Sequence, residues 1–487
     1  MSFFRTLAGA CLALVSTGCV YGYVADADTT TVISGVKIVA DGNCSGAGCG
    51  TPIQQLTDAN GRFVFDAYGN VNGESNVQIV TAKSGEEAIK LTYSKAGYKT
   101  QVVYHQPKYE NVTYEGKDYL ISPVQKVWLC KTGAADSDAD GICNAAEAQF
   151  GTNPNSDDTD GDGLSDLVEI YGANGVDLHV YGANPRRRDV FVEVDYYPAF
   201  KPAQAALDQV VTAFANAPLT NHDGSTGVSL HLVLSSAIAA ADLDMNLSPV
   251  WSDFDVIKNK YFAARRAPYF HYLLVANQYD GGGSSGKSRG IPGHDFLMTL
   301  GNWSTPGGTV QQQAGTLMHE LGHNLGLMHG GNEDLNRKPN YLSIMSYTYQ
   351  LGGLRVNGTS GVVDYSRLRV ASVSEAAVNE ASAFGALAPT TEADLANYQV
   401  MINGAWRSGT ASANLDFNGN GAIAAASYAY DLNGDGDTSD VYVASQNDWS
   451  AVVYDGAGTI GADGTSGLPV LHFLRLPEVA PDCATEF

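Results

Sequence analysis

Three histidines, His319, His323 and His329, constrain this chain more than any other feature, because their spacing suits only one kind of backbone. The first two are four residues apart within the segment from Thr309 to Leu327, which is predicted to be a helix. Histidines at that spacing project from one face of a helix and can bind the same metal ion. Gly326 can adopt a positive φ and end the helix, so that the third histidine reaches the ion from another direction.

Glu320 has the chemistry of a general base for this metal site. It follows His319 directly and is turned from it by about 100° around the helix, so its carboxylate can take a proton from water at the metal. Three histidine ligands leave the fourth position of a tetrahedral zinc ion open, as a catalytic zinc requires. The pattern therefore predicts a catalytic Zn²⁺ site, and a buried helix with incidental histidines is the alternative.

The complete string H-E-L-G-H-N-L-G-L-M-H resembles the metzincin signature H-E-x-x-H-x-x-G-x-x-H. Its Gly322 and Asn324 make it especially similar to adamalysins, pappalysins and gametolysins. The segment from Ser343 to Tyr347 resembles the methionine turn of metzincins. This resemblance implies that Met345 supports the histidines from below. As in astacins and serralysins, it also implies that Tyr347 is a movable zinc ligand that stabilises the oxyanion, and a tyrosine of the hydrophobic core is the alternative.

The resemblance implies a zinc metalloendopeptidase that hydrolyses protein or peptide substrates by metal-activated water. In metzincins the substrate pairs with an edge strand of the sheet, which we expect here from Phe296 to Leu300. The alternative from another class is a calcium-dependent surface adhesin whose zinc site is inactive. Glu320 argues against it, because a structural zinc needs no base.

Two acidic segments match the twelve-residue EF-hand loop, which uses side-chain oxygens at positions 1, 3, 5, 9 and 12 and a carbonyl at position 7. The first copy has Asp136, Asp138, Asp140, Ile142, Asn144 and Glu147, and the second has Asp158, Asp160, Asp162, Leu164, Asp166 and Glu169. Because the copies are in register, we predict structural Ca²⁺ sites, with a solvated acidic linker as the alternative. The repeat resembles bacterial thrombospondin type 3 repeats, which implies that calcium stiffens the join between domains.

Two further segments near the C-terminus begin like calcium loops but lack glutamate at position 12. Their oxygen-bearing side chains are Asp416, Asn418 and Asn420 in one segment, and Asp431, Asn433 and Asp435 in the other. Calcium sites and Asx-rich turns fit this pattern equally well.

Residues 1–19 have the pattern of an export signal, with one arginine, an apolar run from Leu7 to Val15, and small residues before Cys19. The last four of these residues resemble the bacterial lipoprotein cleavage box, although Ser16 replaces the usual leucine. This implies lipidation of Cys19 and attachment to a membrane, with ordinary cleavage near Ala25 to Ala27 as the alternative. We therefore expect an exported protein, either a cell-envelope lipoprotein or a secreted one.

The cysteines are consistent with an oxidising compartment. Two sequence-close pairs are candidate disulfides, Cys44 with Cys49 and Cys130 with Cys143, and Cys483 is left over.

The chain carries 28 Lys and Arg against 52 Asp and Glu, a formal charge of -24, which would repel nucleic acid. A nucleic-acid partner is therefore not expected.

The segment from Gly281 to Ser288 satisfies the P-loop pattern, so a nucleotide hydrolase is a remote alternative. A P-loop needs a helix that starts at Lys287, and the glycines and proline from Gly290 to Gly293 disfavour one there. The same glycines contain G-x-S-x-G around Ser284, without the strand-turn-helix elbow of a serine nucleophile. A loop is the better interpretation.

We expect a multidomain protein with an all-β sandwich, a calcium-loop linker and an α/β metzincin catalytic domain, whose mixed twisted sheet carries the active-site helix. The sandwich resembles the carboxypeptidase-regulatory domain in two segments, Thr57 to Phe65 and Lys95 to Thr100. The predicted boundaries are 1–19 for the signal peptide, 20–131 for the sandwich, 132–184 for the repeats and 185–487 for the catalytic domain. Strands are predicted at Asp189 to Tyr196, Ser229 to Leu234 and His271 to Ala276.

Overall fold

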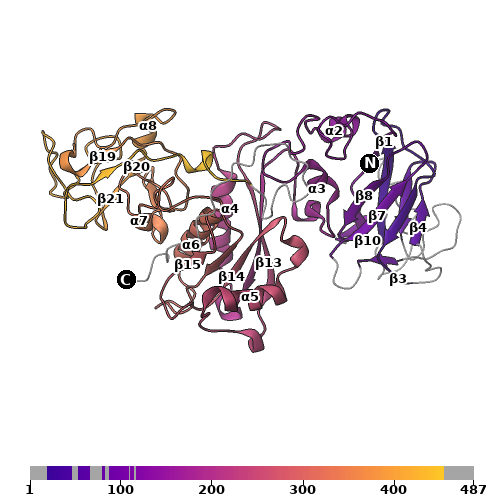
Figure 1. The fold of residues 1–487 in the computed structure, drawn as a ribbon, viewed down its shortest axis with the longest axis horizontal. Coiled ribbons are helices and arrows are strands. Elements are labelled where there is room, and N and C mark those ends of the chain that lie inside the picture. Colours follow the sequence, from indigo (N-terminus) through magenta and orange to yellow (C-terminus); the bar gives the residue numbers. More distant parts are fainter. Residues whose placement is uncertain are drawn as a thin grey trace. The chain divides into compact units, whose positions relative to one another are not determined.

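The computed structural model describes residues 19–45, 53–65, 79–82, 87–108, 110–114 and 117–454. These residues belong to two compact units, which divide between Asp189 and Val190 (Figure 1). The predicted signal segment before Cys19 lies outside the described residues, as do Cys49 and Cys483, so lipidation and the first cysteine pair stay predictions. Among the described residues, no helix has the length and apolar character needed to cross a membrane.

The first unit contains a sandwich of two sheets whose inner faces share one hydrophobic core. Side chains of β7 (Ile89–Ser94) alternate between buried and half-buried positions, as expected for a strand with one face in a core. One sheet contains β11 (Val127–Leu129), β1 (Cys19–Asp26), β10 (Lys117–Pro123) and β9 (Glu110–Tyr114), with β5 (Arg62–Phe65) paired to β1. The other contains β4 (Ile53–Leu56), β2 (Lys37–Asp41), β7 (Ile89–Ser94) and β8 (Gln101–His105), and β3 (Asn43–Ser45) pairs with β6 (Ile79–Thr81).

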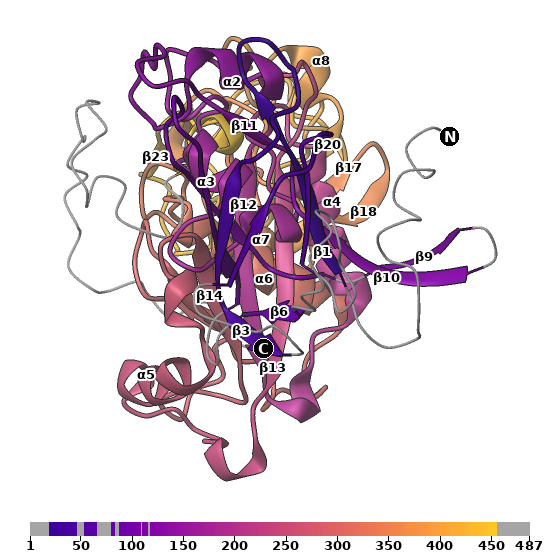
Figure 2. The ribbon, with the colours of Figure 1, turned by 90° about the vertical axis from the view of Figure 1, so that its right-hand side faces the viewer.

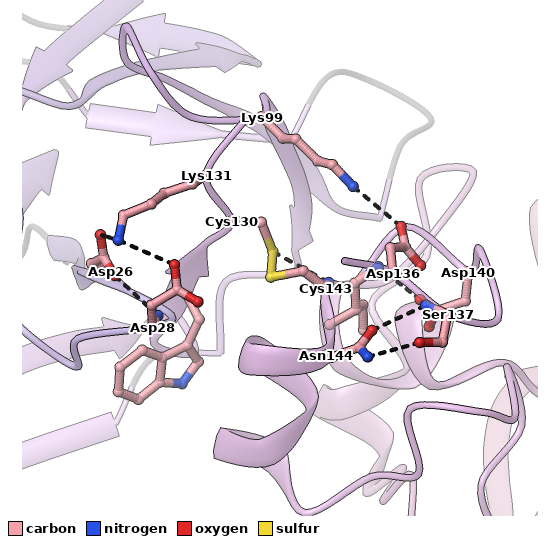
Figure 3. Close-up of a disulfide and its surroundings, with 12 residues drawn as sticks. Asp26, Asp28, Lys99, Cys130, Lys131, Asp136, Ser137, Asp140, Cys143 and Asn144 are labelled. Carbon is pink, nitrogen blue, oxygen red and sulfur yellow. Dashed lines mark hydrogen bonds and ion pairs between the residues drawn. A yellow bond between two sulfur atoms is a disulfide. The ribbon is translucent and has the colours of Figure 1, made fainter. Parts of the chain in front are cut away.

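The acidic repeats pack against this sandwich within the same unit. They include the short helices α2 (Asn144–Phe150) and α3 (Asp166–Tyr171), and the 3-10 helix η1 (Leu178–Tyr181) follows them. Ala146 and Tyr171 are buried in the core of the sandwich. A disulfide joins Cys130 and Cys143, whose Cα atoms are 5.9 Å apart (Figure 3). The segment expected to be a linker therefore shares a core and a covalent bond with the domain before it.

The second unit is built on a five-stranded mixed sheet in the order β13-β12-β14-β16-β15. Strands β12, β14 and β16 are parallel, and β15 runs antiparallel to β16. The bounds are β12 (Asp189–Tyr196), β13 (Ser229–Ala237), β14 (Phe270–Val275), β15 (Gly286–Ser288) and β16 (Asp295–Met298). Every residue of β14 is buried, which is typical of a parallel strand covered on both faces.

Helices cover both faces of this sheet (Figure 2). Leu273 and Val275 of β14 share a core with α4 (Gln204–Ala215) and α6 (Val310–Asn324). The alternate residue Tyr272 faces α5 (Val250–Tyr261), where its ring centroid lies 5.5 Å from that of Phe254. The sheet therefore holds α6, which carries the histidine motif, against one rigid face.

The part of the second unit that follows α6 has a second hydrophobic core of its own, from Leu342 to Tyr442. The chain then returns to the first core through Trp449 and Val452. The elements of this part are short: α7 (Tyr347–Gln350), β17 (Leu354–Val356), β18 (Thr359–Val362), β19 (Val373–Ser374), η5 (Glu375–Ala377), α8 (Glu392–Leu395), β20 (Tyr398–Gln399), β21 (Met401–Ile402), β22 (Ala405–Trp406), β23 (Val441–Tyr442) and η6 (Asp448–Ser450). The expected single α/β domain thus has an irregular, separately packed portion.

Candidate metal centres

Helix α6 begins with a capping box, which fixes the start of the helix that carries the histidines. The Thr309 hydroxyl accepts from the Gln312 backbone N–H, and the Gln312 side chain accepts from Thr309 N. Gly322 lies between the first two histidines of the motif, and a Cβ there would lie 2.3 Å from Met345 Sδ. The absence of a side chain at this position lets the methionine turn approach the helix closely.

The structure brings the three predicted histidines together. The Nε2 atoms of His319 and His323 are 3.1 Å apart. The ring of His329 lies 5.3 Å from that of His319 and 4.8 Å from that of His323, measured between centroids. Gly326 has a φ of +91°, so the chain turns there as the sequence predicted. One nitrogen of each ring lies within 4.8 Å of the others, which is a spacing that a single ion can bridge.

Each ring is oriented by a hydrogen bond from its Nδ1 atom, which leaves Nε2 for a metal. The Nδ1 of His319 donates to Ile344 O (3.0 Å), that of His323 to Leu327 O (2.7 Å), and that of His329 to Asp334 Oδ1 (2.6 Å). The Nε2 of His329 is buried and has no hydrogen-bond partner. A bound cation would satisfy this nitrogen, and the donor set fits zinc.

Burial keeps these imidazoles neutral, which metal binding requires. It lowers the pKa of His323 to about 3, with a further contribution from the neighbouring His329. Burial also lowers the pKa of His319, and that of His329 although Asp334 opposes the shift. At neutral pH the three rings can therefore offer lone pairs.

Two predicted companions of the histidines are buried, and the ring of the third lies beside His329. Glu320 is fully buried, and a Cβ built on Gly286 of β15 would lie 2.7 Å from its Oε1 atom. The ring of Tyr347, the first residue of α7, lies 4.5 Å from that of His329. Met345 is buried in the core of the sheet. The phenol of Tyr347 thus lies beside the three imidazoles, and Glu320 is buried next to His319 on the same helix.

The expected edge strand was wrong. Strand β16 covers part of the predicted segment from Phe296 to Leu300, but it lies between β14 and β15 inside the sheet. The edge strand is β15, and it belongs to the glycine-rich segment interpreted as a loop. Lys287 accordingly lies in a strand, not at the start of a helix, so the P-loop geometry is not formed there.

The two acidic repeats place their oxygens as calcium loops do. One carboxylate oxygen from each of Asp136, Asp138 and Asp140 lies within 4.8 Å of the others, and the same holds for Asp158, Asp160 and Asp162. Both carboxylate oxygens of Glu147 and of Glu169 are buried without a hydrogen-bond partner. These glutamates occupy position 12, where a bidentate calcium ligand is expected.

The remaining loop positions have partners within the protein. At position 9, Asn144 bonds to Ser137 and Asp166 bonds to Thr159, so both side chains brace the loop itself. At position 1 of the first loop, Asp136 Oδ2 lies 3.3 Å from Lys99 Nζ (Figure 3). Ile142 and Leu164 are buried through their side chains, which leaves only their backbone carbonyls as candidate ligands at position 7.

Sequence reasoning missed Asp189. This residue starts β12 outside the repeats, yet one of its oxygens lies within 4.8 Å of oxygens from Asp162 and Glu169. Its backbone N–H also donates to Asp162 Oδ2 at 2.7 Å. Three buried carboxylates at this distance repel one another unless a cation or protons neutralise them.

The pKa values reflect this crowding of charge. Burial and neighbouring carboxylates raise the pKa of Glu147 to about 8 and that of Asp160 to about 8. The same causes raise the pKa of Asp140 to about 7, against a lowering hydrogen bond from Ile142. Divalent cations in these loops would relieve the repulsion.

Residues 136–156 and 158–171 match the family model of the bacterial TSP3 repeat. These repeats bind calcium, and their presence indicates an extracellular or surface protein. The predicted calcium loops therefore have support from a family match as well as from geometry.

No curated protein matches the chain. Solved structures that match include 3-chlorocatechol 1,2-dioxygenase from Rhodococcus opacus 1CP, with 13% identity over 24% of this chain and 62% of that one, at a TM-score of 0.16. Domains D2 and D3 of the major pilin SpaD from Corynebacterium diphtheriae match with 14% identity over 24% of this chain and 48% of that one, at a TM-score of 0.15. The chain thus spans less than two thirds of either protein, and neither likeness bears on function.

Proposed function

We propose that the protein is an exported zinc-dependent endopeptidase of the metzincin kind. The observation that carries the proposal is the convergence of three buried histidine rings, each oriented through Nδ1, beside the buried carboxylate of Glu320. A structural zinc would need no base at this position. The mixed sheet with an antiparallel edge strand over the histidine helix supports the same assignment.

When bound, zinc would supply Lewis-acid activation of a water molecule and of the scissile carbonyl. His319, His323 and His329 would hold the ion through their Nε2 atoms. Glu320 would take the proton from the water and pass it to the leaving amine. Tyr347 would donate a hydrogen bond to the oxyanion, because its ring already lies beside that of His329.

We propose that the substrate pairs with β15 as a sixth strand of the sheet, in either antiparallel or parallel orientation. This strand pairs with β16 on one side and forms the edge of the sheet on the other. Glu320 lies directly under Gly286 of this strand. A peptide paired with β15 would lie one inter-strand spacing from the strand that contacts the general base Glu320.

Replacing Glu320 by glutamine tests the proposal. The amide keeps the size of the side chain but cannot accept the proton, so we expect peptidase activity to fall by about 10²–10⁴-fold while one zinc per chain stays bound. Hydrolysis of a proteome-derived peptide library and metal analysis of the same sample would measure both.

A Glu333→Gln variant is the matched control, because that glutamate follows the motif but pairs with Lys338. The alternative is a calcium-dependent surface adhesin with an inactive zinc site, which agrees with the calcium binding and surface location that the repeat match indicates. That alternative would be supported if the wild-type protein with bound zinc cleaved nothing in the library.

A further inference from the structure

The acidic loop from Asp431 to Asp440 lies in the irregular part of the second unit. It resembles a calcium loop but lacks the glutamate of position 12. Its pattern has calcium-loop residues at positions 1, 3 and 5 but tyrosine, Tyr442, at position 12.

The backbone of this loop folds like that of the second TSP3 repeat. In the repeat, Asp158 Oδ1 and Oδ2 accept from Gly161 N and Gly163 N at 2.7 and 2.8 Å. In the C-terminal loop, the oxygens of Asp431 accept from Gly434 N and Gly436 N at 2.6 and 2.8 Å. In both loops, the backbone N–H groups at positions 5 and 7 donate to the side-chain oxygen of the residue two positions earlier. The first carboxylate is therefore held in the same way in both loops.

Glu375 lies across both ends of this loop. Strand β19 pairs with β23 with Ser374 opposite Val441, which places Glu375 at the loop's end. Glu375 N donates to Asp440 O at 3.0 Å, and Tyr430 N donates to Glu375 O at 2.8 Å. The backbone of Glu375 thus forms hydrogen bonds with the residue before the loop and with the last residue of the loop.

The Glu375 side chain turns into the loop and keeps one oxygen without a partner. Oε1 accepts from Leu432 N at 2.7 Å and from the Tyr442 hydroxyl at 3.0 Å. Oε2 has no hydrogen-bond partner, although the residue is 0% exposed. The same condition, buried and unpartnered, holds for Glu169 at position 12 of the matched repeat. An unpartnered buried carboxylate oxygen costs stability unless a cation or proton satisfies it.

We propose that the loop from Asp431 to Asp440 is a third calcium site in this protein, in which Glu375 replaces the glutamate of position 12. The ligands would be the side chains of Asp431, Asn433 and Asp435, the carbonyl of Asp437, and Glu375 Oε2. Five protein oxygens, several of them charged, suit Ca²⁺, which accepts flexible coordination by six to eight oxygens.

The neighbouring loop at Asp416 differs at the corresponding glutamate. Glu380 holds an equivalent place beside it, but Ala424 N and the Tyr428 hydroxyl already occupy both of its carboxylate oxygens. The described contacts there form a closed hydrogen-bond network, which is the Asx-turn interpretation of the sequence.

Calcium counting on the full-length chain tests the proposal by equilibrium dialysis against CaCl₂ followed by metal analysis. The Glu375→Gln variant should bind one Ca²⁺ fewer per chain than the wild type, or bind that ion at least about tenfold more weakly, as expected for loss of a charged ligand. Asp435→Lys, at an exposed position, should lose the same ion because its ammonium would replace the cation. The Asp435 variant decides the matter if Glu375→Gln does not fold.

Glu392→Gln is the matched control, since it makes the same change at an exposed glutamate outside the loop. It should retain the wild-type calcium count. The proposal is overturned if Asp435→Lys and a folded Glu375→Gln keep every calcium ion, or if Glu392→Gln loses one as well. Peptidase activity is not part of the measurement, so failure here is distinct from failure of the zinc assignment.

Discussion

At the scale of single residues, the histidine motif was readable from the sequence because its spacing is dictated by helix geometry. The residues that orient the rings were not readable. Ile344 and Asp334 reach the histidines only through the fold, and no local pattern marks them. Glu375 and Asp189 were missed for the same reason. Glu375 is far in sequence from the loop that it contacts, and Asp189 lies outside the repeat whose carboxylates it approaches.

The packing of Met345 against Gly322 gives a prediction at this scale. A methyl group added by Gly322→Ala would lie 2.3 Å from Met345 Sδ, and overpacking of this kind costs about 1–3 kcal/mol. Urea unfolding of the second unit should show this loss of stability, together with weaker zinc binding. Gly352→Ala is the control, because nothing lies within 4 Å of a Cβ there. Equal stability of the two variants would contradict the proposed packing role.

At the scale of elements, regular periodicity decided what could be predicted. The strand expected from Asp189 to Tyr196 has the bounds of β12, and the predicted helix differs from α6 only at its ends. The helix ends at Asn324, before the predicted end, because Gly326 has a positive φ that turns the chain away from the helix. Strand β15 was missed because three residues within a glycine-rich segment show no alternation, and only pairing with β16 makes them a strand.

The second TSP3 repeat provides an element-scale prediction. Asp189→Asn should weaken calcium binding at this loop, because it removes one of the three carboxylates that meet within 4.8 Å. Glu169→Gln should weaken it more, since both oxygens of Glu169 lack other partners. Calorimetric titration with CaCl₂ would measure the affinities. Asp157→Asn serves as the control, and a Glu169 variant with wild-type affinity would refute the assignment.

At the scale of the whole molecule, composition and motif spacing predicted several domains, but not how they are packed internally. The sandwich and repeats were expected as separate domains, whereas Ala146 and Tyr171 belong to the sandwich core. The second core of the second unit was not foreseen, because its strands have two to four residues and no measurable period. The resemblance to the carboxypeptidase-regulatory domain stays a prediction.

Calcium should therefore stabilise the first unit as a whole. A ligand that binds only the folded state at about 100 times its dissociation constant adds about 2.7 kcal/mol. We expect the thermal transition of the first unit to rise with calcium concentration and to fall in a calcium-free buffer. Differential scanning calorimetry at fixed zinc would measure the change. A midpoint independent of calcium would show that the loops do not contribute to folding.

The contact between Gly286 and Glu320 has a practical consequence for finding related chains. A Cβ at position 286 would lie 2.5 Å from Leu297 O and 2.7 Å from Glu320 Oε1, so the strand above the carboxylate must be bare backbone here. Genome searches for related chains can therefore require a glycine at the position of Gly286, the first residue of β15, upstream of the histidine motif. Sequences that keep the string but carry a bulkier residue at this place would have a blocked or displaced carboxylate.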